Sequence, residues 1–593
     1  MAFTTRPVVM GTHGAVAAGH YLAAQAGLRL LHMGGNAVDA GVAMGFALAV
    51  LQPDQNGIAG EAPILIYSAD RGRPFAVNGH GVAPRAATIE RFKEMGIELI
   101  PGDGFLPAVV PAALDSYVTA LAVFGTLPLS EVIAPALELA SEGFPVQEGL
   151  RGSIVSSLPL WKERYPSTVK VFAPAGDAGP AGRAPEVGEL LVQPHWAATM
   201  RLLVEAERKA ARGDRIAGLR AARDVFYRGE IAKAICEFAG KTEVLDASGK
   251  AHSCLLTEQD FAAYRARVEP AVSTDYRGIT VHKCNTWCQG PVFLQQLNLL
   301  EGFDLAAMGH NTADYIHTVI ECAKLAFADR NAHYGDPQFV DVPLGRLLSK
   351  AYADERRRLI GSQAASVEDR PGDPQATLAL PPGRKLQPAA SDGAWPETFA
   401  GDTTKCEAVD RFGNMISITP SGGWFSSSPV IPGLGFPLGT RGQMFELDPV
   451  HPNCLQPGKR PRTTLTPTLA TRNGRPWMAF GSPGGDCQDQ WALLFLLNHV
   501  DFGMDLQEAI DAPTFHTVHF RNSFYPRAAF PGRMVVEGRI GEEVRKALAA
   551  RGHTVEVAGD WSNSNTIVVQ FDPDTGLISA AATPRNVSYA IAW

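Results

Sequence analysis

A threonine pair, Thr403-Thr404, stands where an irregular segment ends and an expected strand begins. Residues 362–400 are rich in Pro, Gly and Ala, whereas the apolar runs 406–409 and 415–419 flank a turn sequence and predict a β-hairpin. If the bond before Thr403 is cleaved, its hydroxyl gains a neighbouring α-amine, whose ordinary pKa is about 8. That amine can act as base for the hydroxyl, which gives an N-terminal threonine nucleophile for acyl transfer. A Thr-Thr pair alone is more often only the start of a strand, because threonine favours strands.

Three later segments could assist such a nucleophile. Antiparallel pairing would place Ser421, which follows the second strand of the hairpin, beside Thr403. Residues 459–468 concentrate cations and hydroxyls, which suits a loop that binds an anionic or polar acyl group. Gly484 and Gly485 join an expected strand to an expected helix, where backbone N–H groups could stabilise an oxyanion by roughly 3 kcal/mol per donor. Each segment also has an ordinary interpretation, as turn chemistry, a solvated loop and a tight turn.

The composition excludes several function classes. The 593 residues are 46% hydrophobic and carry a net charge of -8, so there is no basic surface for nucleic acid. The longest apolar stretch, 40–51, is too short to cross a bilayer, and residues 1–14 lack a signal-peptide pattern. The eight cysteines have no Cys-x-x-Cys spacing, which argues against zinc. We therefore expect a cytoplasmic protein with buried thiols and without metal, cofactor, nucleic acid or membrane partner.

The elements that must position these residues mix helices and strands. Asn36 predicts a cap for a helix over 37–51, in which Asp39 is expected to be a hydrogen-bonded structural carboxylate. The chain beyond Thr403 is expected to be rich in strands as far as Cys487. Helices are predicted over 21–32, 37–51, 115–124, 129–142, 291–300, 313–330 and 487–499, with a solvated helix pair over 197–222, and strands over 63–68, 75–78, 279–283 and 477–480.

Taken in order, short motifs along nearly the whole chain resemble the γ-glutamyltransferase family of N-terminal-nucleophile hydrolases. They are 34–40 (GGNAVDA), 57–60 (GIAG), 326–330 (AFADR), 335–337 (GDP), 401–404 (GDTT), 460–461 (RP), 466–468 (TPT), 482–485 (SPGG) and 508–513 (EAIDAP). The resemblance implies an α/β fold of the four-layer αββα sandwich type. It also implies a precursor that cleaves itself into a large subunit, 1–402, and a small subunit, 403–593, which together form one structural domain. The prolines and the lack of periodicity in residues 362–402 predict that the large subunit ends in a mobile linker.

The resemblance assigns roles to four residues of the acyl-transfer machinery. Thr403 matches the nucleophile and Ser421 the hydroxyl residue that supports it. Gly484 and Gly485 match the oxyanion hole.

The substrate-binding positions depart from the family. His80 replaces an arginine that clamps a carboxylate, and it lacks the fork of guanidinium donors. Glu446, shortly after Gln443, takes the place of an amine-binding aspartate, and Thr463 and Thr464 take the place of paired serines. The family asparagine after the supporting hydroxyl is Gly423 here. Arg462 is a candidate replacement cation for an acidic acyl group, although a surface arginine would look the same. The segment 446–460 is short, so we expect no lid, and water should compete with amine acceptors.

Three hypotheses follow. The first is a self-processing Thr amidohydrolase that cleaves a small amide, with a γ-glutamyl-like or other acidic acyl group, through an acyl-enzyme. The second is a true γ-glutamyltransferase acting on glutathione-type donors, and the third is an uncleaved homologue that serves as a binding protein. The first two predict a heterodimer of cleaved subunits, and the sequence leaves open whether these dimerise further.

Overall fold

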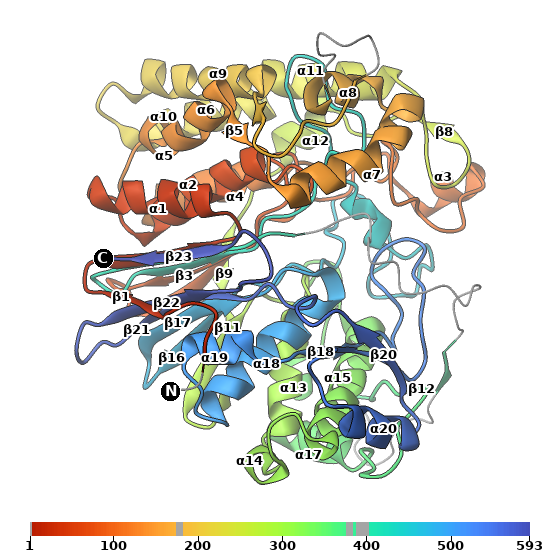
Figure 1. The fold of residues 1–593 in the computed structure, drawn as a ribbon. Helices are drawn as coiled ribbons and strands as arrows, with labels where there is room; N and C mark the ends of the chain where they lie inside the picture. The colour runs from red at the N-terminus through yellow and green to blue at the C-terminus, as the bar shows by residue number, and fades with distance from the viewer. Residues whose placement is uncertain (1–2, 174–181, 375–383, 387–402) are drawn as a thin grey trace.

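The protein folds into four layers, with two sheets packed face to face between two layers of helices (Figure 1). The computed structural model describes residues 3–173, 182–374, 384–386 and 403–593. Each large sheet has seven strands, and all neighbours within it are antiparallel. This arrangement confirms the predicted αββα sandwich.

The first sheet carries the hairpin that begins beside Thr403. Its strands, in spatial order, are β23 (Tyr589–Ala592), β2 (Gly14–Ala18), β14 (Cys406–Asp410), β15 (Met415–Ile418), β3 (Ile64–Ser68), β4 (Arg73–Val77) and β9 (Val268–Pro270). The second sheet carries the strand that leads to Gly484. Its order is β1 (Val9–Gly11), β22 (Ile578–Ala582), β21 (Ile567–Phe571), β17 (Arg475–Gly481), β16 (Thr468–Arg472), β11 (Ile279–Lys283) and β10 (Val272–Tyr276).

Helices cover the outer face of each sheet. On the side of the first sheet lie α1 (Tyr21–His32), α2 (Ala37–Leu51), α4 (Ala113–Phe124), α5 (Leu129–Val132), α6 (Ala134–Glu142), α7 (Glu148–Arg164), α8 (Pro166–Phe172), α9 (Pro194–Ala211), α10 (Arg215–Tyr227), α11 (Glu230–Lys241) and α12 (Glu258–Ala263). On the side of the second sheet lie α13 (Pro291–Leu300), α14 (Leu305–Met308), α15 (Ala313–His333), α17 (Lys350–Arg357), α18 (Gln488–Val500), α19 (Leu506–Asp511) and α20 (Glu542–Ala550).

The remaining elements are short. They are helices α3 (Ile89–Glu94) and α16 (Leu344–Leu347), the sheet β18 (Phe515–Thr517), β19 (Arg533–Glu537) and β20 (Thr554–Ala558), and the ribbons β5 (Phe144–Pro145) with β6 (Leu190–Leu191), β7 (Val244–Leu245) with β8 (Ala251–His252), and β12 (Glu368–Asp369) with β13 (Arg384–Lys385).

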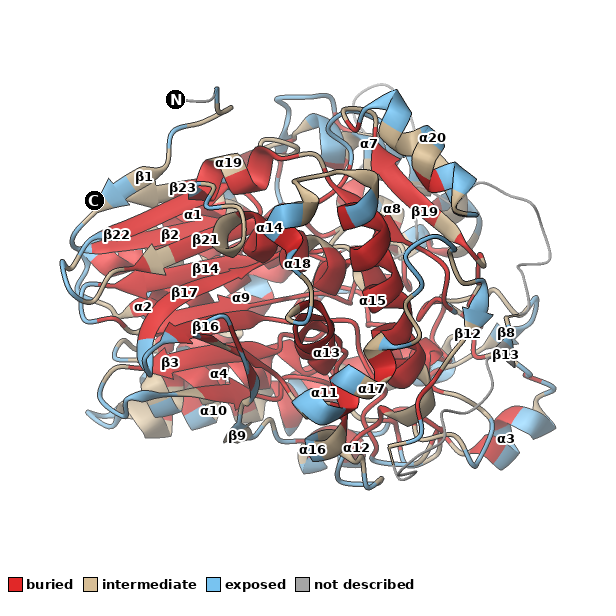
Figure 2. Ribbon diagram, turned by 90° about the horizontal axis from the view of Figure 1, so that it is seen from below, coloured by how far each residue is buried: buried red, intermediate tan, exposed pale blue. Residues whose placement is uncertain are grey.

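The two sheets are held together by alternation along each strand. In β2, Val16 and Ala18 face the outer helices, whereas Ala15 and Ala17 face the second sheet. In β17, Phe480 packs toward the helices while Ala479 packs between the sheets. Most residues of these strands are therefore buried on both faces (Figure 2), and the small side chains between the sheets allow close packing.

Most of the predicted elements are present, several with the expected bounds. Asn36 caps α2 through a capping box, and Asp39 accepts hydrogen bonds from the backbone and hydroxyl of Thr126, which confirms its structural role. All of α2 is buried because it lies between the first sheet and the outer helices. Seven of the eight cysteines are buried, as expected for reduced thiols, and Cys236 is half-buried. Within the described residues, none of the helices combines the length and the hydrophobicity that a bilayer-spanning segment requires.

Two expectations about the middle of the chain were wrong. Residues 420–467 were expected to be strand-rich, but within this described range the structure has only isolated bridges and the 3-10 turn η1 (Arg441–Met444). Glycines and prolines interrupt the apolar residues of this segment, which are buried by packing against other elements instead. The predicted helix over 129–142 is divided into α5 and α6, with Pro135 at the start of the second helix.

Part of the expected linker is held against α15. Arg370 forms an ion pair with Glu321 at 2.8 Å, the Ser366 carbonyl accepts a hydrogen bond from Lys324, and the Gly372 N–H donates to Asp329. The expected mobility of residues 375–383 and 387–402 concerns positions outside the described residues.

Candidate active site

Thr403 lies directly beside Ser421. The register of β14 with β15 pairs Cys406 with Ile418, and the ladder continues as an isolated bridge between Thr403 and Ser421. The Thr403 hydroxyl donates to Ser421 Oγ at 3.2 Å, and both residues are buried. The hairpin therefore brings together the two hydroxyls that the sequence singled out.

A buried ion pair holds Ser421 in turn. Arg441 donates through Nη2 to Ser421 Oγ at 2.8 Å and through Nε to Glu61 Oε2 at 3.0 Å. Glu61 also forms a backbone bridge with Ser421. Burial raises the pKa of Glu61, and the Arg441 charge opposes that increase. Glu61 and Arg441 are 380 positions apart, so no local sequence pattern indicates that either has a functional role.

The glycines of the turn 57–61 are required by close backbone contact with this site. A Cβ atom on Gly60 would lie 2.1 Å from the Ser421 carbonyl oxygen, and one on Gly57 would lie 2.5 Å from the Gly423 carbonyl oxygen. Gly423, where the family has asparagine, has φ of 63°. The glycines thus allow Glu61 to reach Ser421 and Arg441.

Gly484 and Gly485 form the junction between β17 and the helical segment η2 (Gly485–Cys487), which continues into α18. Both have positive φ, 121° at Gly484 and 53° at Gly485. A Cβ on Gly485 would lie 3.1 Å from the Phe524 ring. The Phe524 ring centroid lies 5.7 Å from Arg441 Cζ, so Phe524 is a neighbour both of this turn and of the arginine that holds Ser421. Backbone N–H groups at this helix start are suited to stabilise an oxyanion.

Directly after Thr403 and Thr404, a charged pair is buried between the sheets. Lys405 Nζ lies 3.0 Å from Glu407 and donates to Ser417 and Thr419. Burial raises the pKa of Glu407 to about 7, against the opposing effect of the Lys405 charge. A Cβ on Gly481 would lie 2.7 Å from Lys405 Nζ, so this ammonium group also contacts the strand that leads to Gly484.

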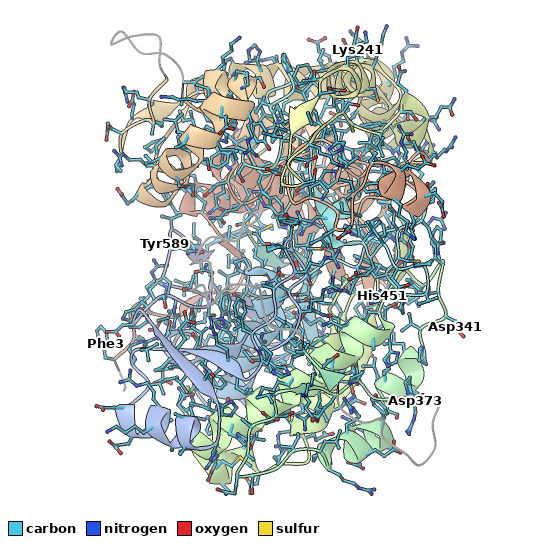
Figure 3. All side chains as sticks on the ribbon, turned by 90° about the vertical axis from the view of Figure 1, so that its right-hand side faces the viewer. Phe3, Lys241, Asp341, Asp373, His451 and Tyr589 are labelled. Atoms are coloured by element: carbon cyan, nitrogen blue, oxygen red, sulfur yellow. The ribbon has the colours of Figure 1, made fainter. Side chains whose placement is uncertain are left out.

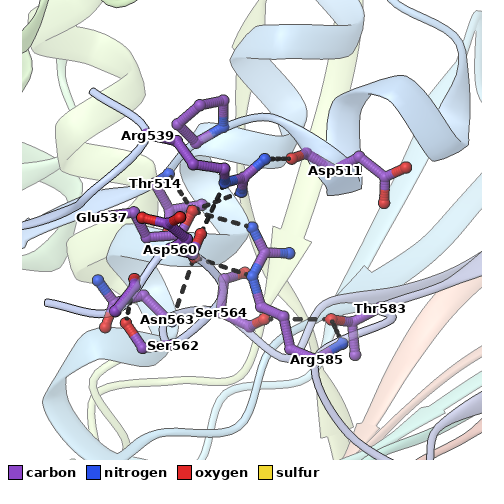
Figure 4. Close-up of polar contacts among 12 residues, drawn as sticks. Asp511, Thr514, Glu537, Arg539, Asp560, Ser562, Asn563, Ser564, Thr583 and Arg585 are labelled. Atoms are coloured by element: carbon purple, nitrogen blue, oxygen red, sulfur yellow. Dashed lines mark hydrogen bonds and ion pairs between the residues drawn. The ribbon is translucent and has the colours of Figure 1, made fainter. Parts of the chain in front are cut away.

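A second network supports the glycine turn from outside. The Asn565 N–H donates to Ser482 Oγ at 3.0 Å. The loop that carries Asn565 is held by Glu537, which accepts hydrogen bonds from the Asn563 N–H and from Arg585 and Arg539 (Figure 4). Glu537 is fully buried, so the two guanidinium groups neutralise its charge.

Glu446, the expected amine-binding residue, is already paired with two arginines. It forms ion pairs with Arg527 and with Arg521, the latter at 3.2 Å. These arginines lower its pKa even though burial acts in the opposite direction. The amide of nearby Gln443 binds the backbone of Gly102 and Tyr525. Neither side chain is free to bind an ammonium group without rearrangement.

Arg462 lies near these residues but has no acidic partner. Its guanidinium donates to Ser523 Oγ at 3.1 Å from both terminal nitrogens. Ser523 Oγ donates to Asp486, and Asp486 forms a buried ion pair with Arg330. Among the described residues, no carboxylate oxygen lies within 4.0 Å of the Arg462 guanidinium nitrogens. Burial, together with the Arg330 and Arg527 charges, lowers the Arg462 pKa well below its usual value.

The other predicted substrate contacts have different surroundings. His80 is fully buried and donates through Nε2 to the Pro461 carbonyl at 2.6 Å. Burial lowers its pKa well below the usual value, so the ring is neutral and does not supply a charge for a carboxylate. We therefore interpret His80 as a support for the segment that carries Arg462. Thr463 forms backbone hydrogen bonds with Trp287 and Gln289, while the buried Thr464 hydroxyl has no hydrogen-bond partner among the described residues.

A separate surface pocket of about 300 Å³ lies along the loop between Glu446 and Arg462. Asp341, Asp373 and His451, which line it, lie on one side of the molecule (Figure 3). None of the four predicted catalytic residues lines it.

Among the described residues, His317, Glu321 and His553 form a cluster of side chains of the types that bind metal ions. Glu321 is already neutralised by Lys324 at 2.6 Å and by Arg370, so this cluster is poorly suited to a divalent cation.

Comparisons with known proteins agree with this geometry. The sequence model of the family described as Gamma-glutamyltranspeptidase matches residues 23–593. The chain is 31% identical over 587 residues to the glutathione hydrolase-like YwrD proenzyme of Bacillus subtilis (strain 168), covering 98% of this chain and 99% of the relative. It is 33% identical over 605 residues to the acylase ACY 1 proenzyme of Pseudomonas sp. (strain SE83), covering 98% and 95%.

Among solved structures, cephalosporin acylase from Bacillus halodurans aligns with a TM-score of 0.83 at 32% identity, covering 100% of this chain and 98% of that one. The structure of LmbA2991HD aligns with a TM-score of 0.92 at 43% identity and covers 100% of both chains. From the whole-length family match and these relatives, the chain belongs to the γ-glutamyltranspeptidase family of enzymes.

Proposed function

We propose that this protein is a self-processing amidohydrolase whose nucleophile is Thr403 and whose substrate is a small amide with an acidic acyl group. The observation that carries the proposal is the hydrogen-bonded series from Thr403 to Ser421, Arg441 and Glu61. This series holds the Thr403 hydroxyl at the end of a strand, and Phe524 is a neighbour both of Arg441 and of the Gly484-Gly485 turn. Relatives described as proenzymes support the self-cleavage step.

The first chemical step uses the chain end created by cleavage between residues 402 and 403. The Thr403 α-amine takes the proton of its own Oγ1, which attacks the substrate carbonyl carbon. The oxyanion that forms is stabilised by the N–H groups of Gly484 and Gly485, and Ser421 keeps Oγ1 in place. The ammonium then returns the proton to the leaving amine as the C–N bond breaks. The product of this step is an ester between the acyl group and Thr403.

Water completes the reaction. The free α-amine accepts a proton from water, hydroxide adds to the ester carbonyl, and the C–O bond to Thr403 breaks. The proton returns to Thr403 Oγ1, and the carboxylic acid leaves. The segment 446–460 is a compact loop held by Asn453, which bonds the Met444 carbonyl and the Arg462 N–H. We expect no long lid to exclude water from the ester, so hydrolysis should exceed transfer to amines.

Two alternative functions have different structural requirements. A true γ-glutamyltransferase needs a free anion for the substrate ammonium group, and glutathione hydrolases among the relatives favour it. An uncleaved binding protein would need no nucleophile, and the hydroxyl pair Thr403–Ser421 argues against it.

A substrate panel tests the proposed function. Purified two-chain enzyme should release p-nitroaniline from at least one acidic acyl anilide, and rapid acid quenching should leave the acyl group on the small subunit at Thr403. Peptide mass spectrometry identifies the acylated residue. Acylation at another residue, or turnover without any acylated protein, contradicts the proposal.

A further inference from the structure

The groups around Arg462 carry an excess of buried positive charge. Arg330, Arg462 and Arg527 are each at least nine-tenths buried, and their neighbouring carboxylates are Asp486 and Glu446. Three buried cations therefore face two anions. A buried charge without a counter-ion is costly, so this cluster favours the binding of one more anion.

Arg462 is the member of the cluster that lacks its own anion. Arg330 pairs with Asp486 and Arg527 pairs with Glu446. Arg462 has only the Ser523 hydroxyl, which is shared with Asp486. Both terminal nitrogens of the Arg462 guanidinium donate to the same hydroxyl. They could instead donate to the two oxygens of a carboxylate, which is the bidentate contact that arginine favours.

The location of Arg462 links this charge to the reaction. Its partner Ser523 precedes Phe524. The Phe524 ring lies 3.1 Å from where a Cβ on Gly485 would be, and its centroid lies 5.7 Å from Arg441 Cζ. Arg462 is also two residues before Thr464, whose buried hydroxyl has no hydrogen-bond partner among the described residues. An anion at Arg462 would therefore lie two residues along the chain from an unused donor, and beside the segment Ser523-Phe524 that contacts the proposed oxyanion turn.

The same cluster is unfavourable for an ammonium group. Glu446, the carboxylate at the position where the family binds an amine, is bound by Arg527 and Arg521. Arg527 also donates to the carbonyls of Gln443 and Phe445, so it is fixed in place. An ammonium group near Glu446 would have to displace a guanidinium or stand beside it, which costs free energy by like-charge repulsion.

We propose, building on the acyl-enzyme function above, that the preferred acyl group is a dicarboxylic one without an α-ammonium group and that Arg462 binds its distal carboxylate. Glutaryl is the matched form of γ-glutamyl that lacks the ammonium group. Arg462 is then a specificity-determining residue, and Glu446 is an internal counter-ion for Arg527 and Arg521.

Three anilides that differ by one group test this proposal. Glutaryl, γ-L-glutamyl and pentanoyl p-nitroanilide have acyl chains of the same length, with the carboxylate alone, the carboxylate plus the ammonium, and neither. On two-chain wild-type enzyme, kcat/KM for glutaryl should exceed that for each of the others by about 10-fold or more, as expected for a charged hydrogen bond. A preference for γ-glutamyl or for pentanoyl overturns the inference.

Three variants locate the effect. Arg462→Gln should lower kcat/KM for glutaryl anilide by about 10- to 100-fold and leave pentanoyl anilide within about threefold. Arg462→Lys should recover part of the loss. Arg521 is half-exposed and pairs with Glu446 outside this cluster. The matched control Arg521→Gln should keep most glutaryl activity and raise the ratio of γ-glutamyl to glutaryl turnover severalfold. An equal loss for glutaryl and pentanoyl in Arg462→Gln contradicts a role in carboxylate recognition.

Inhibition of the wild-type enzyme tests the idea without a variant. Glutarate should inhibit pentanoyl anilide hydrolysis at a concentration about 10-fold lower than L-glutamate or pentanoate. Equal inhibition by the three acids contradicts the inference even if Arg462→Gln does not fold. A preference for γ-glutamyl over glutaryl anilide overturns this inference alone, because both acyl groups are acidic, whereas a protein that acylates none of its residues overturns the proposed function as well.

Discussion

Arg441 donates a hydrogen bond to Ser421 Oγ at 2.8 Å, so the hydroxyl that accepts from Thr403 is itself fixed by a buried guanidinium. Ser421 can therefore orient Thr403 Oγ1 without being free to rotate. The arrangement also places a positive charge one hydroxyl away from the proposed nucleophile, which favours an oxygen that carries developing negative charge.

Removal of the supporting hydroxyl should therefore slow the chemistry more than binding. Ser421→Ala is expected to lower kcat by about 10- to 100-fold with little change in KM, because the hydroxyl orients the nucleophile and not the substrate. Ser421→Thr, which keeps a hydroxyl, should retain more activity. Steady-state kinetics on the two-chain protein measure both values, and a change confined to KM would contradict this role.

The Arg441–Glu61 pair should be important for stability. Both side chains are about 1% exposed, so Arg441→Met leaves the Glu61 charge buried without its partner and should lower the free energy of unfolding by about 3 kcal/mol. Glu61→Gln in the same chain should recover part of that loss. Chemical denaturation of the four proteins of this double-mutant cycle provides the coupling energy, and purely additive losses would argue against a coupled pair.

These two residues also show where prediction from sequence stops. Helix α2, its Asn36 cap and the hairpin at Thr403 follow from local patterns, because capping and alternation are encoded within a few residues. The contact of Glu61 with Arg441, in contrast, joins residues 380 positions apart. The 420–467 region shows a second limit: its apolar residues are buried by packing without forming strands, so the expectation of a strand-rich region was wrong there.

The charged residues at the start of β14 show a pattern that predicts their pairing. Lys405 and Glu407 alternate with apolar residues in a strand that is buried on both faces, so they must share one face and neutralise each other there. The engagement of Glu446 by Arg527 could not be inferred, because it depends on how the loop after β18 packs.

Glu407 should make stability depend on pH with a defined sign. Its pKa in the folded protein is raised to about 7, above the ordinary value of 4.5, so the folded state binds the additional proton between these values. This contribution is fully present below pH 4.5 and is lost as the pH rises toward 7, with a total of roughly 3 kcal/mol. Comparison of the wild type with Glu407→Gln removes the effects of other titrating groups.

The measurement is the free energy of unfolding by urea at pH 5, 6, 7 and 8. The wild type should lose stability relative to Glu407→Gln across the interval from pH 5 to 7, and the difference should level off above pH 8. Two results contradict a raised Glu407 pKa. One is a stability difference between the two proteins that is independent of pH, and the other is a wild type that loses stability relative to Glu407→Gln as the pH falls.

The glycine turn should tolerate no side chain without loss of activity. Gly485→Ala places a Cβ 3.1 Å from the Phe524 ring at φ of 53°, which should displace the N–H groups and lower kcat by about 100-fold. Gly503→Ala is a suitable control, because Gly503 also has positive φ but an added Cβ meets no atom within 4 Å. If both variants keep normal kcat, the turn is not the oxyanion site.

Intact-mass spectrometry of the purified protein is the most direct test of the central claim, that Thr403 becomes an N-terminal nucleophile. The wild type should give two chains whose masses correspond to residues 1–402 and 403–593, whereas Thr403→Ala should give one chain of about 63.4 kDa. A wild type that stays in one piece, or a Thr403→Ala variant that is still cut between residues 402 and 403, would contradict the account.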